Sequence, residues 1–288
     1  MGIGMDVLSI FFVLLSAVFH SIWNFLAKTS RDKYVFSWWM KLFEFILFLP
    51  LSIYLWATGG VQSAGWMIVI LSGVVHFAYW MLLMSSYTFA DLSIVYPIAR
   101  SAPVLVTIFA VLFFDEQLSI GGVFGILGVM GGVYLLTIEG THFRSWSILR
   151  NKGVLFALLT ALAVTAYSLI DKQGAQFFPP ILYVWLENAV SLLPLSSVIL
   201  RTKRNKIFPE WHDNKWIIIV SGFLGLLSYS LIVFVMQSFQ VSYIVSIRQV
   251  SVVFGVILGG TILRERHLKK RLLASILIFI GLFLITTG

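Results

Sequence analysis

Two arginines, Arg100 and Arg248, lie deep inside hydrophobic segments of this 288-residue chain. An arginine near the centre of a bilayer costs roughly 2.5–3.5 kcal/mol on insertion scales, so each needs a compensating function. A guanidinium presents a planar set of N–H donors that matches a carboxylate or a phosphate. The two arginines therefore predict a site in which they hold the anionic group of a solute between them. The alternative is that a protein carboxylate such as Glu187 or Glu44 neutralises each arginine for packing alone.

Further polar and aromatic side chains occur in groups with helical spacing. His20, Trp23 and Asn24 are spaced i, i+3, i+4, and His76, Tyr79 and Trp80 repeat that spacing. Polar side chains in lipid-embedded helices face the bundle interior, so these groups are predicted to line a cavity. The remaining predicted substrate-binding residues are Tyr96, Tyr167, Trp185, Glu187, Tyr229 and Gln249.

Charged pairs and prolines add two expectations. Lys41 and Glu44 are spaced i, i+3 and are interpreted as a structural ion pair. Glu187 either counters an arginine or takes up a proton. Pro97 and Pro103 flank Arg100, so the helix around this arginine is expected to be bent or locally unwound.

Composition places the whole chain in a membrane. Hydrophobic residues make up 59% of it and charged residues 11%, against about 25% charged in typical soluble domains. No disulfide is possible because there is no cysteine, and the net charge of +8 is explained by short loops rather than by nucleic acid.

A span of about 20 apolar residues crosses the hydrocarbon core, and ten such spans are predicted. They cover residues 5–27, 34–57, 64–88, 92–114, 119–138, 152–170, 180–200, 215–238, 241–263 and 270–287. Lysine and arginine concentrate in the loops after the odd-numbered spans, whereas the opposite face has only Lys172. The positive-inside rule predicts a protein of a prokaryotic inner membrane with both termini outside.

An internal repeat divides the chain. A shift of 144 residues aligns LLSA (14–17) with LLTA (158–161), and it aligns LPLS (49–52) with LPLS (193–196). A shift of 149 aligns Glu116 with Glu265. We expect an all-α polytopic protein with two inverted five-helix repeats, residues 1–140 and 152–288, joined by a cytoplasmic linker at 141–151, because an odd number of spans inverts the second half.

A family resemblance accompanies this pattern. The motif AP-x12-E-x-L occurs as Ala102, Pro103, Glu116 and Leu118, and with ten helices in two halves it resembles the EamA-type branch of the drug/metabolite transporter superfamily. Asp115 stands where a glycine often precedes the glutamate. The stretch from His20 to Asn24 is similar to members associated with phosphonate utilisation.

The predicted function is a secondary transporter that moves a small organic metabolite with an anionic group by alternating access. The alternatives are an exporter of amino acids or aromatic metabolites and a flippase of a lipid-linked phosphate. A coupling proton or an exchanged solute is expected, since the chain has no GxxxxGK[ST] motif for ATP. No enzymatic motif, cofactor, metal site or nucleic-acid partner is indicated.

Overall fold

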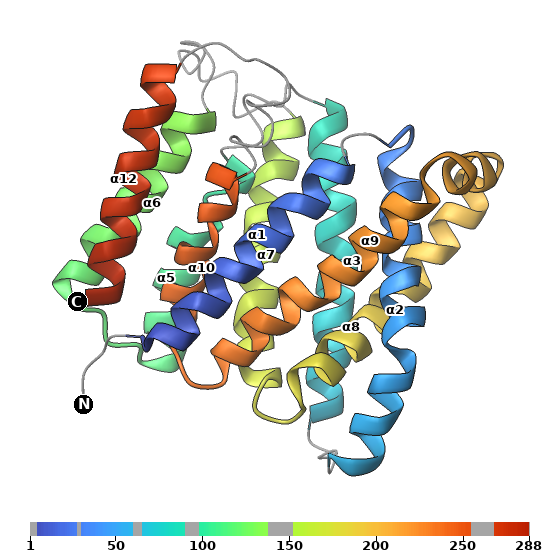
Figure 1. Ribbon diagram of the computed structural model, residues 1–288, viewed down its shortest axis with the longest axis horizontal. Coiled ribbons are helices and arrows are strands. Elements are labelled where there is room, and N and C mark those ends of the chain that lie inside the picture. Colours follow the sequence, from blue (N-terminus) through green and yellow to red (C-terminus); the bar gives the residue numbers. More distant parts are fainter. Residues whose placement is uncertain are drawn as a thin grey trace.

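The computed structural model describes residues 5–27, 30–59, 65–89, 98–137, 152–254 and 268–287, and these residues are almost entirely helical (Figure 1). The helices in these ranges are α1 (Val7–Ala27), α2 (Lys33–Thr58), α3 (Trp66–Phe89), α5 (Ala102–Phe114), α6 (Ile120–Thr137), α7 (Lys152–Gly174), α8 (Pro180–Thr202), α9 (Arg204–Met236), α10 (Val241–Arg248) and α12 (Leu268–Thr287).

Six of the described helices are long and apolar enough to cross a membrane, namely α1, α2, α3, α7, α8 and α9. Shorter apolar helices lie at 102–114, 120–135, 241–254 and 276–286. Large side chains such as Leu112, Phe124 and Phe283 are exposed on the outside of the bundle, as expected where lipid rather than water surrounds it.

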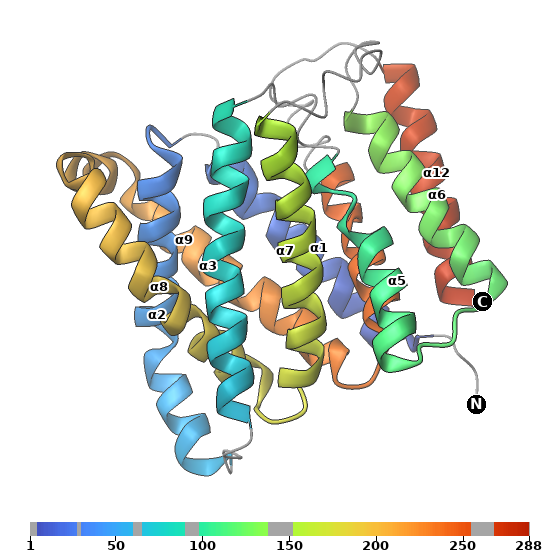
Figure 2. The same ribbon diagram turned by 180° about the vertical axis from the view of Figure 1, so that it is seen from behind.

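The helices pair in a pattern that is unchanged when the two halves are exchanged. Helix α1 packs on α9 and its counterpart α7 packs on α3, while α2 packs on α9 and its counterpart α8 packs on α3. Because α2 corresponds to α8 and α6 to α12, exchanging the halves leaves the pairs α2–α8 and α6–α12 unchanged. Figure 2 shows α6 beside α12 at one edge of the bundle and α3 beside α7 near its middle. A two-fold relation between halves produces this pairing.

Glycines allow α6 and α12 to approach closely. A Cβ at Gly125 would lie 2.6 Å from the carbonyl oxygen of Gly281, and a Cβ at Gly132 would lie 2.7 Å from that of Ala274. Gly125, Gly128 and Gly132 of α6 all lie against α12, so the regular spacing of small residues along this helix serves helix packing.

Both arginines lie where a helix is interrupted. Residues 98–99 are helical, Arg100 and Ser101 form a turn, and α5 begins at Ala102 with Pro103 in its first turn. This break was expected from the prolines. The span predicted at 241–263 is also interrupted, because α10 ends at Arg248 and helical structure resumes at Val250. No proline marks that second break, so the sequence pattern did not reveal it.

Helix α9 corrects another predicted boundary. The span was predicted to begin at 215, but the helix begins at Arg204 and includes Pro209. Its start is seen end on in Figure 1, turned away from the rest of the helix, which is the effect expected of a proline near a helix start. The additional turns carry Glu210 and Asn214 into a buried contact, so tertiary structure stabilises a helix where composition suggested a loop.

Asp32 connects the start of α2 to the start of α9. Its carboxylate accepts hydrogen bonds from Val35 N at 3.3 Å, from Lys203 Nζ at 2.7 Å and from Lys206 Nζ at 2.9 Å, and the Asp32 N–H donates to Glu210. Burial raises the pKa of Asp32, but the hydrogen bonds from Lys203 and Lys206 outweigh it and hold the pKa below its usual value.

We expect protonation of the Asp32 carboxylate to make the protein less stable in acid. Because its pKa is lowered in the folded state, its stabilising effect is complete above the ordinary aspartate pKa of about 4 and is lost as pH falls below it. Thermal melting in detergent should show that Asp32→Asn lowers stability by about 1–2 kcal/mol near neutral pH and less below about pH 4. A constant difference at all pH values would contradict this role.

Glu116, the glutamate of the AP-x12-E-x-L motif, caps a helix of the other half. Its carboxylate accepts from Val241 N at 2.7 Å, from Ser242 N at 3.3 Å and from Ser242 Oγ at 2.5 Å, all at the start of α10. Asp115 before it has φ 51° and ψ 34°, a left-handed conformation that explains why glycine is common there. The motif thus positions the short helix that ends at Arg248.

Loss of this cap should weaken the contact between the halves. We expect Glu116→Ala to lower stability by about 1–2 kcal/mol, because two helical N–H groups lose their acceptor, and Glu116→Gln to cost less. Melting of the purified protein measures this, with the exposed Gln117→Ala as the matched control. Equal melting of all three variants would show that the cap contributes nothing.

Candidate functional site

Arg248 lies inside the bundle beside His20 and Tyr229. Its Nη2 lies 3.4 Å from Nδ1 of His20, and its Cζ lies over the Tyr229 ring, 5.2 Å from the ring centre. Its Nε is buried and has no hydrogen-bond partner. Among the described residues, no carboxylate forms an ion pair with Arg248, whereas six other basic side chains of this part of the chain each have one or two such partners. The guanidinium therefore retains donor capacity toward the interior.

Arg100 interacts with two side chains that also interact with Arg248. Both Arg100 and Arg248 interact electrostatically with His20 and with Tyr167, so the two arginines converge on one part of the interior. Each lies at a helix interruption, where backbone polar groups leave the helical pattern. Irregular backbone at membrane depth is tolerated where it is covered by protein or lines a water-filled cavity.

Aromatic rings extend this region along α1, α3 and α7. The Trp23 ring packs edge-on to His20 at 5.0 Å and lies 6.4 Å from Trp80. Tyr79 contacts Trp80 at 5.5 Å and Tyr167 at 5.6 Å between ring centres. The predicted groups on the first and third helices thus meet in one aromatic cluster, whose faces suit the apolar part of an organic solute.

Asp171 is the residue that sequence analysis missed. It is fully buried and accepts hydrogen bonds from Ser72 Oγ at 2.5 Å, from Tyr183 OH at 2.7 Å and from Tyr229 OH. The predicted span ended at 170, which left Asp171 in a loop, but α7 continues to Gly174. The available signal was its i, i+4 spacing from Tyr167, which places both on one face of the helix.

His76 joins Asp171 to a second group of charges. Its Nε2 lies 3.8 Å from Asp171 Oδ2, and its Nδ1 lies 3.5 Å from Glu187 Oε2. Beyond Glu187, Lys41 Nζ pairs with Glu44 Oε2 at 3.0 Å, which confirms the predicted ion pair. The His76 ring also stacks on Tyr167 at 4.2 Å and lies 5.6 Å from Tyr229. Glu187 is therefore paired with His76, and not with an arginine, among the described residues.

Four predicted site residues lie elsewhere or outside the described residues. Asn24 donates to the carbonyl of His20 in its own helix, and Trp185 donates to the Phe45 carbonyl and stacks on that ring away from the arginines. Gln249 is buried at the end of α10 next to Arg248, and its Oε1 has no hydrogen-bond partner. Tyr96 is outside the described residues.

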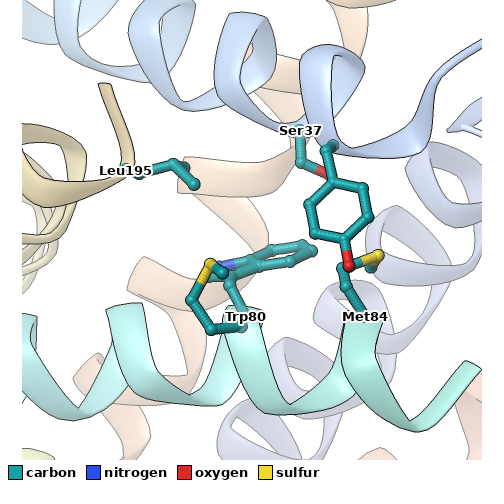
Figure 3. Close-up of a pocket in the computed structure, with 6 residues that line it drawn as sticks. Ser37, Trp80, Met84 and Leu195 are labelled. Atoms are coloured by element: carbon teal, nitrogen blue, oxygen red, sulfur yellow. The ribbon is translucent and has the colours of Figure 1, made fainter. Parts of the chain in front are cut away.

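A small apolar pocket of about 10 Å³, with space for about one water molecule, lies between α2, α3 and α8. Figure 3 shows Trp80 and Met84 rising from α3 toward Ser37 and Leu195. Its other lining residues are Tyr34 and Met81, and Arg100 and Arg248 do not line it. Since Trp80 also contacts Tyr79 and Trp23, its indole lies between the pocket and the other rings of the aromatic cluster.

A helical bundle that exposes apolar side chains outside, buries carboxylates and a histidine inside and encloses two partly buried arginines defines an integral membrane protein with a polar interior. The chain belongs to the EamA-like transporter family, which matches residues 7–138 and again residues 151–287. Proteins of this family have two repeats of five helices and transport small solutes across membranes; they are not enzymes. The resemblance drawn from the AP-x12-E-x-L motif is confirmed.

A solved structure titled "Crystal structure of protein" is similar to this chain. It has a TM-score of 0.80 and 16% identity, and the match covers 96% of each chain, so it supports the fold alone. No curated protein matches this sequence as a relative.

Proposed function

We propose that this protein is a secondary transporter that carries a small organic anion by alternating access between residues 1–140 and 152–288. The observation that carries the proposal is Arg248, a cation inside the bundle whose Nε has no partner and which lacks a carboxylate partner among the described residues. A buried cation without a counterion is costly, and an anionic solute that arrives from water supplies the missing charge.

The proposed binding site combines two kinds of contact. Arg248, together with Arg100 and the ring of His20, receives the carboxylate, phosphate or phosphonate group. The aromatic cluster of Trp23, Tyr79, Trp80 and Tyr167 receives the apolar part of the solute. This division favours an organic anion over inorganic phosphate, which has no apolar part.

The helix breaks support the alternating-access part of the proposal. Arg100 and Arg248 occupy related positions in the two halves, and each lies at an interruption between two helical pieces. Discontinuous helices at the interface of inverted repeats are a recurring feature of transporter binding sites near the membrane midplane. We further propose that both termini lie outside a prokaryotic inner membrane, with the basic Lys203 and Lys206 on the cytoplasmic side.

Transport by purified protein in liposomes tests the function directly. Vesicles loaded with one solute are mixed with the same solute in radioactive form, and a panel of phenylphosphonate, phenylacetate, glycerol phosphate, phenylalanine and phenethylamine is compared. We expect exchange of the anions and no exchange of the cation phenethylamine. Exchange of phenylalanine alone would favour the alternative function, an exporter of amino acids, and overturn the requirement for net negative charge.

A lipid-linked phosphate is the second candidate, and an apolar groove of about 320 Å³ between α2 and α8 is the observation in its favour. It is lined by Ile53, Trp56, Ala57 and Trp185, and the exposed side chains of Ile53 and Trp56 face the lipid, so it suits an acyl or isoprenoid chain. A fluorescent phospholipid whose outer-leaflet copies are bleached by dithionite would report flipping. Flipping without exchange of any soluble anion would replace the first proposal by this one.

A further inference from the structure

We propose that His76 carries the coupling proton of transport, held between Asp171 and Glu187, and that one proton crosses the membrane with each organic anion. This inference rests on the proposed function, because it names the ion that accompanies the anion at the same interior site.

Both ring nitrogens of His76 face acceptor oxygens. Nδ1 faces acceptors, the Ser72 carbonyl oxygen at 3.1 Å and Glu187 Oε2 at 3.5 Å. The Ser72 hydroxyl lies 3.2 Å from Nδ1, but its proton is donated to Asp171. On the other side, Nε2 faces Asp171 Oδ2 at 3.8 Å. A neutral imidazole has one N–H, so it leaves a ring lone pair facing a carboxylate; an imidazolium places an N–H on both sides.

Glu187 depends on His76 for a donor to its Oε2, and a neutral ring can donate to Glu187 only by leaving its lone pair toward Asp171. Its Oε2 is buried and has no hydrogen-bond partner, and Nδ1 of His76 lies 3.5 Å from it. Asp171, in contrast, already accepts hydrogen bonds from three hydroxyl groups. Protonation of His76 supplies the missing partner of Glu187 without disturbing those hydroxyls.

Carboxylates outnumber ammonium groups next to His76, and the guanidinium of Arg248 lies farther away, across the Tyr229 ring. The groups that face it or its carboxylate neighbours are Tyr167 and Asp171 on α7, Tyr183 and Glu187 on α8, Tyr229 on α9, and Lys41 and Glu44 on α2. Within this described set, three carboxylates share one ammonium group, that of Lys41. A proton on His76 reduces the imbalance.

Tyr229 connects this cluster to the anion site. Its ring centre lies 5.2 Å from Arg248 Cζ and 5.6 Å from the ring centre of His76, and its hydroxyl donates to Asp171. With Arg248 unoccupied, its positive charge opposes a proton on His76 across the ring. A bound anion cancels that charge, so anion binding and proton binding assist each other by about tenfold at an effective dielectric constant of about 20.

The proton then moves through the cycle by simple addition and loss. A hydronium ion on the acidic side gives a proton to a free ring nitrogen of His76 when the anion binds, and water on the opposite side takes it back when the anion leaves. No other bond is made or broken, and net transport of a monovalent anion is electroneutral. An inward proton gradient therefore accumulates the anion.

Proton flux and anion flux are measured together in proteoliposomes that contain the pH indicator pyranine. With phenylacetate as the probe and a pH of about 6 outside and about 7.5 inside, we expect uptake about tenfold above the rate without a gradient, accompanied by internal acidification beyond that of protein-free vesicles. His76→Gln should lose the response to the gradient but keep exchange of internal for external phenylacetate within about twofold. Glu187→Gln serves as the second variant if His76→Gln does not fold. The exposed His212→Gln is the matched control and should behave as the parent protein.

Each outcome separates the two proposals. Phenylacetate uptake that ignores the pH gradient, or a gradient response that survives His76→Gln, would overturn the coupling inference and leave the anion site standing. Loss of exchange in a folded His76→Gln variant would assign His76 to solute binding instead and would also overturn it. If neither phenylacetate nor phenylphosphonate exchanges in the parent protein, the proposed function fails and the coupling falls with it.

Discussion

Replacing Arg248 by alanine is expected to slow exchange of the transported anion by about 100-fold, because the anionic group loses its charge-assisted hydrogen bonds. The structure gives this side chain no carboxylate among the described residues, so little protein structure depends on it. The variant should therefore retain the parent melting temperature in the absence of solute. Binding is followed by the rise of melting temperature with phenylphosphonate or phenylacetate, which appears only when the folded protein binds them.

Two further variants show why Arg248→Ala should slow exchange. Arg248→Lys keeps the charge but not the planar set of donors, and we expect it to recover part of the loss, to within about tenfold of the parent. Arg31→Ala removes an arginine that is exposed and paired with Asp213 at 2.8 Å, and it should exchange solute within about twofold of the parent. Normal exchange in a folded Arg248→Ala variant would eliminate the anion site as proposed.

Asp171→Ala is expected to produce the largest loss of stability, about 3–5 kcal/mol. Ser72, Tyr183 and Tyr229 come from three other helices, and their hydroxyls would all lose the same acceptor inside the bundle. Each buried hydroxyl left without a partner costs about 1–3 kcal/mol. Unfolding of the purified protein in mixed micelles, followed by tryptophan fluorescence, measures the change.

The isosteric Asp171→Asn variant retains one acceptor oxygen and should lose about half as much stability. Tyr183→Phe removes a single donor and should cost about 1 kcal/mol. Asp213→Ala, at a partly exposed position of α9, should change stability by less than about 0.5 kcal/mol. If Asp171→Ala and Asp213→Ala have the same stability, Asp171 does not hold the four helices together.

The membrane class and most helix positions follow from sequence because they depend on local properties. A run of apolar residues long enough for the hydrocarbon core must become a helix there, so α1, α2 and α8 begin and end within a few residues of the predicted spans. The i, i+3 spacing likewise paired Lys41 with Glu44. Boundaries failed where a tertiary contact extends a helix, as at Glu210 in α9 and at Asp171 in α7.

The candidate site divides in the same way. Sequence alone identified Arg100, Arg248, His20 and His76, because charged and titratable groups inside apolar segments are expensive wherever the segments pack. Only the tertiary structure decided that Glu187 faces His76 instead of an arginine, and that Tyr229 lies between Arg248 and Asp171. Hydrophobic periodicity indicates which face of a helix is buried. Which side chains on α3, α7, α8 and α9 contact one another depends on how the four helices pack.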